Sequence, residues 1–382
     1  MAKGLTFLLV LLIVSAGCSS STEPSSQPST EPSAEAPAGS TDQAQTPNKE
    51  LTNEEIAMLK GENREQILME GAKKEGKLNW YTTIIVDQAV RPLAEAFEKK
   101  YPFIKVEYYR ADSEGVAQKV INEYQGRRYE VDIVDGTNAG SAMKMANISM
   151  PFYSPYLEDF PEELRKDETY AISHLYYYAL GYNTNLVSKD EVPKTYEDLL
   201  DPKWKGKMAF KPNGNSGAGG LIGTILLNNG QEKGMEYLEK LSQQDITVLD
   251  MSARAVLDRV IAGEYPIGLQ IFNHHAVISS NSGAPVAWQP LEPALSSGSA
   301  VTVLKNAPNP HSAMLFMDFI LSEEGQNILK EADYIPANSK VTAKYPELKP
   351  EEGGYESFYL DQTVEVTQGP EWARIFEELF LN

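Results

Sequence analysis

The sequence contains only one cysteine, Cys18, and four histidines among its 382 residues. A single cysteine excludes an internal disulfide framework. Basic residues are also scarce, because 34 lysines and arginines stand against 54 acidic residues and give a formal net charge of −20. This charge argues against nucleic acid or an anionic membrane surface as a partner. It says nothing about the charge inside a binding cleft, which a few local groups determine.

Long hydrophobic runs are absent except near the N-terminus, where residues 5–14 follow a short basic start. This run is too short to cross a bilayer as a mature helix, and it is typical of a secretory signal. Small residues then lead to Cys18, a pattern that resembles the bacterial lipobox except at Ser15, where leucine is usual. We therefore expect a signal peptide over residues 1–17 and lipidation of Cys18. An ordinary cleaved signal is the alternative.

Residues 19–49 consist almost entirely of serine, threonine, proline, alanine, glutamine and glutamate. Such a composition cannot bury enough apolar surface to fold. We predict that residues 18–50 form a lipidated, disordered tether that holds a folded body near a membrane.

From residue 51 onward, apolar strands alternate with amphipathic helices. The expected strands are residues 77–83, 104–109, 131–134, 176–185, 207–211, 265–272 and 300–304, and the expected helices include residues 86–101, 113–124, 310–321 and 371–380. This alternation indicates an α/β fold with a mostly parallel sheet. In such sheets ligands bind where the strands end. The residues at these ends carry neutral donors rather than carboxylates, and they are Thr82, Thr83, Gly136 and Thr137.

A short apolar strand, a turn at residues 212–215 and a helix follow one another within residues 207–227. The helix opens with Ser216-Gly217-Ala218-Gly219. The first N–H groups of a helix are unpaired and its dipole is positive there, so such an end attracts an anion. The alternative is an ordinary N-cap followed by glycines that permit close packing.

Six segments in the same order resemble one family. They are residues 70–83 (EGAKKEGKLNWYTT), 94–106 (AEAFEKKYPFIKV), 182–186, 201–207 (DPKWKGK), 300–321 and 321–326 (LSEEGQ). The family is the extracellular solute-binding proteins of ABC importers, in the group described as iron(III)-type. The resemblance covers roughly residues 70–337.

This resemblance implies a two-lobed type II periplasmic-binding-protein fold. Each lobe has a mostly parallel sheet flanked by helices, crossover strands join the lobes, and the ligand lies in the cleft between them. We expect residues 51–178 and 290–325 in lobe 1, and residues 179–289 and 326–382 in lobe 2. The first crossover is expected at residues 176–183 and the return near residues 285–289.

The implied function is that of a transport component rather than an enzyme. The protein would be a monomer, would need no cofactor, and would deliver its solute to the transmembrane subunits of an ABC permease. It would be held at the outer face of a bacterial cell membrane by its lipid alone, and it would bind no nucleic acid.

Ferric-binding members of the family hold the metal with adjacent tyrosines just after the strand that corresponds to residues 265–272. Here that place reads Phe272-Asn273-His274-His275, so the tyrosine pair is missing. Adjacent residues on a strand point to opposite faces, so His274 and His275 chelate one ion only if the strand has ended. We therefore predict no metal site, with a ferric site at these histidines as the alternative.

The Ser216-Gly217-Ala218 triplet does match the family, where it holds an anion at a helix start. The resemblance favours a small anionic solute or an iron(III)–anion complex as the ligand. The expected donors are the Ser216 hydroxyl and the N–H groups of Gly217 and Ala218. Other residues complete the expected site: Thr82, Thr83 and Thr137 from the other lobe, an amide from Asn273, and positive charge from protonated His274.

A serine hydrolase is a minor alternative. Residues 214–218 come close to the G-x-S-x-G nucleophile elbow, and Asp250 and His274 follow Ser216 in the order of that enzyme class. An elbow needs a direct strand–turn–helix, whereas a Pro-Asn-Gly turn separates Ser216 from its strand.

Overall fold

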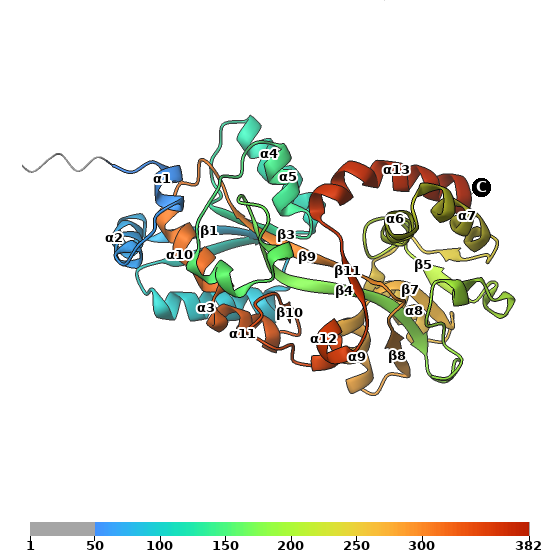
Figure 1. Cartoon of the computed structure of the whole chain (residues 1–382). Helices are drawn as coiled ribbons and strands as arrows, with labels where there is room; N and C mark the ends of the chain where they lie inside the picture. The colour runs from blue at the N-terminus through green and yellow to red at the C-terminus, as the bar shows by residue number, and fades with distance from the viewer. Residues whose placement is uncertain (1–49, 382) are drawn as a thin grey trace, which may run out of the picture. The chain divides into compact units, whose positions relative to one another are not determined.

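A long strand, β4 (Ala171–Asn183), runs through both halves of the structure and belongs to both of its sheets (Figure 1). The structure is a computed structural model that describes residues 50–381. The predicted signal peptide, the lipidation site Cys18 and the predicted tether lie outside the described residues, apart from residue 50.

The bounds of the elements are as follows. The other strands are β1 (Lys77–Thr82), β2 (Lys105–Arg110), β3 (Ile133–Gly136), β5 (Met208–Phe210), β6 (Thr247–Val248), β7 (Ile267–Phe272), β8 (Val286–Gln289), β9 (Ala294–Val303), β10 (Ile335–Pro336) and β11 (Ser357–Tyr359). The α-helices are α1 (Asn53–Ala57), α2 (Arg64–Glu75), α3 (Arg91–Lys100), α4 (Ser113–Gln125), α5 (Ala139–Met145), α6 (Ala218–Asn229), α7 (Gln231–Ser242), α8 (Ala253–Ile261), α9 (Asn273–Asn281), α10 (Pro310–Leu321), α11 (Glu323–Glu331), α12 (Pro350–Gly353) and α13 (Gln362–Phe380). A π-helix, η1 (Val86–Val90), leads into α3, and 3₁₀ turns lie at η2 (Pro155–Asp159), η3 (Glu162–Leu164), η4 (Glu197–Leu200), η5 (Pro202–Trp204) and η6 (Pro346–Leu348).

The first lobe is built on the strand order β2-β1-β3-β9-β4. Strands β1, β2 and β3 are parallel, while β9 runs antiparallel to both β3 and β4. Its core is aromatic: the ring of Phe316 in α10 packs 4.9 Å from that of Trp80 and 5.1 Å from that of Phe97. These three side chains are fully buried, so the helices α3 and α10 are fixed on the sheet by apolar burial.

The second lobe continues the order as β4-β7-β5-β6, with β8 also paired to β4. Strand β5 is parallel to β6 and β7, and β7 is antiparallel to β4. The core holds Phe210, Ile222 and Leu238 together with Trp372 and Phe376 from α13. Figure 1 shows α13 beginning beside α5 of the first lobe and running over α6 and α7 of the second.

The fold class is confirmed: helices flank two sheets whose outer strands are parallel. Three of the differences from the expectation concern the segments that join the lobes or lie beside the candidate site. The return crossover is β9, whereas residues 285–289 include β8 at the side of β4. Asn273 begins a helix, α9, that was not expected, and the C-terminal helix begins at Gln362 rather than at residue 371.

The core contacts differ from the predicted lobe limits on the C-terminal side. Leu329, Ile335 and Tyr355 pack in the core of the first lobe, whereas the prediction assigned residues 326–382 to the second. The reason is that α11 follows α10 closely and β10 pairs with β4 at Leu175. Leu360, and later Trp372, Ile375 and Phe376, pack in the core of the second lobe.

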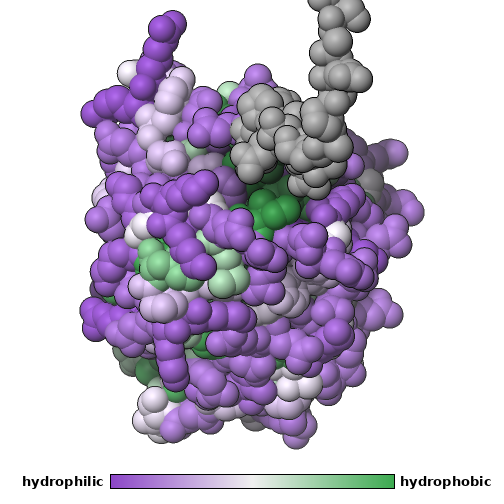
Figure 2. Space-filling model, turned by 90° about the vertical axis from the view of Figure 1, so that its left-hand side faces the viewer, coloured by the Kyte–Doolittle hydropathy of each residue, from purple (hydrophilic) through white to green (hydrophobic). Residues whose placement is uncertain are grey.

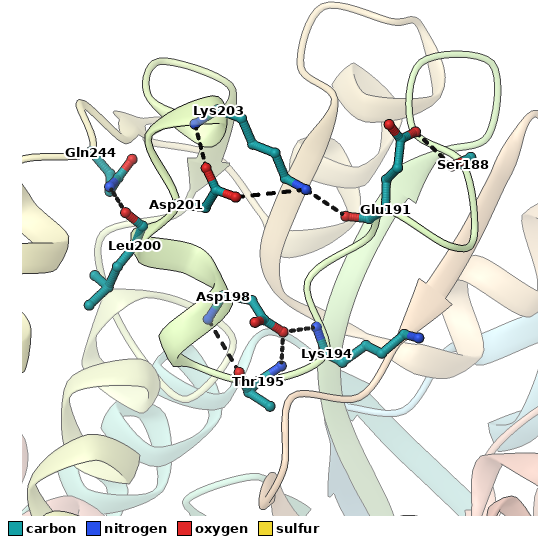
Figure 3. Close-up of polar contacts among 9 residues, drawn as sticks. All are labelled: Ser188, Glu191, Lys194, Thr195, Asp198, Leu200, Asp201, Lys203 and Gln244. Carbon is teal, nitrogen blue, oxygen red and sulfur yellow. Dashed lines mark hydrogen bonds and ion pairs between the residues drawn. The ribbon is translucent and has the colours of Figure 1, made fainter.

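The family motif at residues 201–207 has a structural role (Figure 3). Asp201 caps η5 by accepting from Lys203 N–H at 2.9 Å, and Trp204 is buried beneath it. Gly206 takes a φ of +70° that glycine adopts without strain, and its N–H donates to Gln244 O at 2.8 Å. The motif therefore fixes the turn before β5, which places the loop that leads into α6.

The surface at the outer end of the first lobe is mostly polar. Figure 2 shows a face covered mainly by hydrophilic residues, with small hydrophobic groups between them. Within residues 50–381 no helix is long and apolar enough to cross a membrane.

Gln326 joins α11 to three other segments at the back of the first lobe. Its side chain is fully buried, and Nε2 donates to Ser173 O at 2.7 Å and to Ile320 O at 2.9 Å. Its Oε1 accepts from Ala337 N–H at 2.9 Å and from Asn338 N–H at 3.2 Å. The amide thus ties β4, the end of α10 and the segment after β10 together.

We predict that Gln326→Leu lowers the free energy of unfolding by about 2–4 kcal/mol, because it leaves buried backbone groups without partners. Chemical denaturation followed by circular dichroism measures this. Asn327→Leu is the matched control, since the neighbouring side chain is exposed and bonds only Glu323 O. Equal effects of the two changes would contradict the role assigned to the buried amide.

Candidate functional site

A tight loop, residues 211–217, leads from β5 into α6. Gly217 is the N-cap with φ −156° and ψ −160°, and no side chain caps the helix. Gly214 turns the loop with φ +74°, and the loop folds back because Gly220 N–H donates to Gly214 O at 3.0 Å. Ser216 is half-buried, and its hydroxyl has no hydrogen-bond partner within the described residues. Ser216 is therefore not the cap of this helix.

The N–H groups of Gly217 and Ala218 are not free, which corrects the expectation that both donate to a ligand. Gly217 N–H donates to Gly214 O at 3.1 Å, and Ala218 N–H donates to Lys211 O at 2.9 Å. By contrast, Gly219 N–H has no acceptor within residues 50–381. The donors that remain at this end of α6 are the Ser216 hydroxyl and the Gly219 N–H.

Lys211 is a basic residue of this loop that the sequence pattern did not single out. A Cβ added at Gly214 would lie 3.8 Å from Lys211 Nζ, so the ammonium lies over the loop. The side chain is half-buried and makes no hydrogen bond or ion pair within the described residues. Burial lowers the pKa of Lys211, while the charges of Glu365 and Asp250 raise it. An ammonium without a partner at a helix start favours an anion.

Glu365 of α13 reaches the same loop. Asn215 Nδ2 donates to Glu365 Oε2 at 2.7 Å, and the side-chain amide of Asn138 donates to the same oxygen at 3.1 Å in the orientation that satisfies both its atoms. Asn138 comes from the first lobe and Asn215 from the second. The three side chains line a cavity of about 230 Å³, together with Gly219 and Trp372.

Asp135 is a fully buried carboxyl at the strand ends of the first lobe. Trp80 Nε1 donates to its Oδ2 at 2.6 Å, and Thr83 Oγ1 donates to its Oδ1 at 3.4 Å. The hydroxyl of Thr82, which is fully buried, also bonds Asp135. Burial raises the pKa of Asp135 to about 6, although these hydrogen bonds lower it. The expectation of neutral donors alone is therefore wrong here, because the threonines are committed to a carboxyl.

Gly136 and Thr137 lie at the end of β3, as expected. A Cβ at Gly136 would lie 2.9 Å from Thr83 Cγ2, so glycine permits the close approach of the two strand ends. Thr137 is half-buried, and its carbonyl accepts from the Asn138 amide at 3.1 Å. The next residue, Asn138, lines the same cavity as residues 212–215 of the loop before α6.

Asn273 and His274 lie at the start of α9, close to the crossover strands. Asn273 is fully buried and donates to Leu348 O at 3.0 Å, so its amide is used in packing. The ring of His274 lies 5.6 Å from that of Phe272 and 6.1 Å from that of Tyr176. Burial lowers the pKa of His274 well below 6.5. Burial therefore disfavours the positive charge that was expected for His274.

The alternative of a ferric site at His274 and His275 is supported by the position of the two rings but not by further ligands. No group of three or more His, Cys, Asp or Glu side chains that could hold a metal ion occurs within residues 50–381. The strand has ended before His274 and His275, and their ring centroids lie 4.4 Å apart on α9. The Nδ1 atoms of both are buried without a partner among the described residues.

The hydrolase alternative does not fit this geometry. The ring neighbours of His274 are Tyr176, Phe272 and His275. Within the described residues Ser216 makes no hydrogen bond to His274. The charge of Asp250 raises the pKa of Lys211.

The two lobes share crossover strands, and polar groups of both lobes meet at their junction. The chain matches the family of bacterial extracellular solute-binding proteins over residues 130–352. It is 27% identical to an uncharacterized protein of Haemophilus influenzae over 296 residues, which is 72% of this chain and 81% of that protein.

Solved structures show the same fold. Iron-bound HitA from Pseudomonas aeruginosa superposes with a TM-score of 0.68 at 22% identity, covering 78% of this chain and 99% of that chain. AfuA from Actinobacillus pleuropneumoniae, with fructose-6-phosphate bound, gives a TM-score of 0.63 at 20% identity, covering 80% and 99%.

The chain therefore belongs to the bacterial extracellular solute-binding proteins. This confirms the resemblance seen in the sequence motifs and the type II periplasmic-binding-protein fold. It also establishes the general role, a non-enzymatic transport component that binds a solute outside the cytoplasm.

We predict that His174, His274 and His275 remain neutral down to about pH 5. Burial is the main cause, and it lowers the pKa of His174 to about 3 and that of His275 to about 4. The folded state resists protonation while the unfolded chain accepts protons, so these residues cost stability as the pH falls below 6.5. NMR titration of ring-labelled histidine checks this, with His→Gln variants for assignment. A midpoint above pH 6 for any of the three contradicts the burial described here.

Proposed function

We propose that this protein captures a small anionic solute, or an iron(III)–anion complex, in the cleft between its lobes and delivers it to an ABC permease. The observation that carries the proposal is the ammonium of Lys211, which has no partner within the described residues and lies over the loop before α6. Beside it are the Ser216 hydroxyl and the Gly219 N–H. These are three donors with no acceptor among the described residues.

The negative net charge of −20 opposes an anionic ligand only weakly. At physiological ionic strength the screening length is about 8 Å, so distant surface carboxylates act little on the cleft. Near the loop, the positive charge of Lys211 is partly offset by the negative charges of Glu365 and Asp250, which raise its pKa. A helix start and an ammonium together hold an anion in such a setting. AfuA, solved with fructose-6-phosphate, shares this fold, which supports the proposal.

A ferric ion without an anion is the second candidate. It is favoured by the unpartnered Nδ1 atoms of His274 and His275, and by the fold shared with iron-bound HitA. Against it stands the donor set, since Fe(III) prefers hard oxygen ligands and the tyrosine pair is absent here. Iron would then be cargo, held at the two histidines without an anion.

We further propose that the protein is a lipoprotein at the outer face of a bacterial cell membrane. The support comes from sequence alone: the short apolar run at residues 5–14, Cys18 and the polar segment that follows. The tether would let the folded lobes stand close to the permease.

Replacing either cleft donor should weaken binding. A charge-assisted hydrogen bond contributes about 1.5–3 kcal/mol, which corresponds to roughly tenfold to a hundredfold in affinity. We therefore expect this loss in Ser216→Ala and in Lys211→Met. Calorimetry with inorganic phosphate, phosphonates, phosphate esters and ferric citrate measures it. Lys207→Met is the matched control, because Lys207 precedes the same strand and is exposed.

The two candidates differ in what they predict for these variants. Tight binding of Fe(III) in the absence of any anion, unchanged by Ser216→Ala and lost in His274→Ala, would sink the anion proposal and support the metal one. Unchanged affinity for every anion in Lys211→Met would also count against the anion site.

Cys18→Ala should release the protein from the membrane, because the lipid is its proposed anchor. Fractionation of cells followed by immunoblotting detects the shift, and Ser19→Ala serves as the control. Retention of the Cys18→Ala protein in the membrane fraction would show that something other than this lipid holds it.

A further inference from the structure

The C-terminal helix α13 connects the two lobes outside the crossover strands. At its start, Gln362 is buried in the first lobe, where its Nε2 donates to Gly298 O at 2.9 Å and its Oε1 accepts from Ser141 N–H at 3.3 Å. Farther along, Trp372 and Phe376 are buried in the core of the second lobe. The helix therefore contacts both lobes, and Figure 1 shows it passing from α5 of the first lobe to α6 and α7 of the second.

Glu365 lies one turn after Gln362, at the place where the helix passes from one lobe to the other. Its Oε2 accepts from Asn215 of the loop before α6 and from Asn138 of the segment after β3. Asn215 is 4% exposed, and its Oδ1 has no partner within the described residues. The next residue after Asn215 is Ser216. A movement of Glu365 relative to either lobe therefore changes the geometry beside the proposed anion donors.

We propose that Glu365 is a positioning residue of the solute site: its carboxyl holds Asn138 of one lobe and Asn215 of the other, and so sets the separation of the lobes beside Ser216. This inference rests on the proposed solute site for its functional meaning. The link itself is a property of the chain alone. The carboxyl is the common acceptor for one donor from each lobe, so its removal breaks this link and should let the lobes part.

The link depends on pH because the carboxyl is buried. Burial raises the pKa of Glu365 to about 7 from an ordinary 4.5, against the lowering effects of Asn215, Asn138 and Lys211. The closed arrangement therefore binds a proton more tightly than an arrangement in which water reaches the carboxyl. Closure is fully favoured below about pH 4.5 and weakens as the pH rises to about 7, by at most roughly a few hundredfold in the ratio of closed to open forms.

Few other charged groups face Glu365. From the loop before α6 the facing group is Lys211, and α6 itself contains no ionisable residue. Helix α5 carries Lys144, which pairs with Asp167. Helix α7 and the second half of α13 carry further charges, and the ionisable residues there are Glu232, Lys233, Glu236, Tyr237, Glu239, Lys240, Glu371, Arg374, Glu377 and Glu378. None of these appears among the causes that shift the pKa of Glu365, so its own titration dominates the link.

A distance between the lobes tests the proposal directly. In a Cys18→Ser background, Met145→Cys on α5 and Leu227→Cys on α6 accept spin labels, because both side chains are exposed. Pulsed electron spin resonance without ligand then compares pH 4.5 with pH 8. We expect a longer mean distance at pH 8 in this labelled parent, and a short distance at both pH values in Glu365→Gln, whose neutral amide still accepts from Asn138 and Asn215. Glu365→Ala should give a long distance at both.

Glu371→Gln is the matched control, since it makes the same change on the same helix at an exposed position. Its distances should follow the parent at both pH values. A parent whose distance is constant across this range, or a Glu365→Ala protein as closed as the parent at pH 4.5, would overturn the proposal. Thermal unfolding of each variant shows whether a change in distance reflects lost folding. The measurement needs no solute, so a failed anion site and a failed link are separate results.

Discussion

Antiparallel pairing between β4 and β9 holds the two lobes together, and the cleft depends on it. Ala171 to Tyr177 of β4 pair with β9 in the first lobe, and from Tyr178 the same strand pairs with β7 and β8 in the second. The hydroxyl of Tyr178 lies 2.8 Å from Ser297 Oγ, which adds a side-chain bond at the crossing. Because the lobes share these strands, we expect them to move relative to each other by hinge bending about the strands.

The chemistry of the cleft is set by a few buried charges rather than by the overall charge of the chain. Two carboxyls, Asp135 and Glu365, have raised pKa values because burial disfavours their ionised forms. Both are surrounded by donors from the protein itself. Lys211 alone among the loop's side chains offers a charge without a partner within residues 50–381. An anion there gains an ammonium without displacing an existing ion pair.

The sequence was sufficient for the parts of the fold that repeat a pattern. Helix α10 follows its apolar face from Ala313 to Ile320, and the alternation of strands and helices indicated the α/β class. The sequence was insufficient where a strand or helix is made of small or polar residues, which give no clear apolar pattern. The first half of β9 is rich in serine and alanine, and His274 and His275 gave no sign that α9 begins beside them.

The candidate site could be predicted only in part for a related reason. Ser216 stands out because a helix start carries its own local signal. Glu365 is 150 residues away from its partner Asn215 in the sequence, and only the docking of α13 brings them together. The same docking brings the charge of Glu365 close enough to act on Lys211. Contacts between residues far apart in the sequence produce no local pattern. The positions of the charged groups in the cleft therefore could not be predicted from the sequence.

The central claim is that an anionic group binds between Lys211 and the start of α6. A crystal structure of the protein purified from its own host, with the co-purified solute retained, tests this most directly. The account predicts a negatively charged group within hydrogen-bond distance of Ser216 Oγ and Lys211 Nζ, with the lobes closed around it. A solute bound elsewhere in the cleft with this loop unoccupied, or a metal ion held by His274 and His275 without an anion, would contradict it.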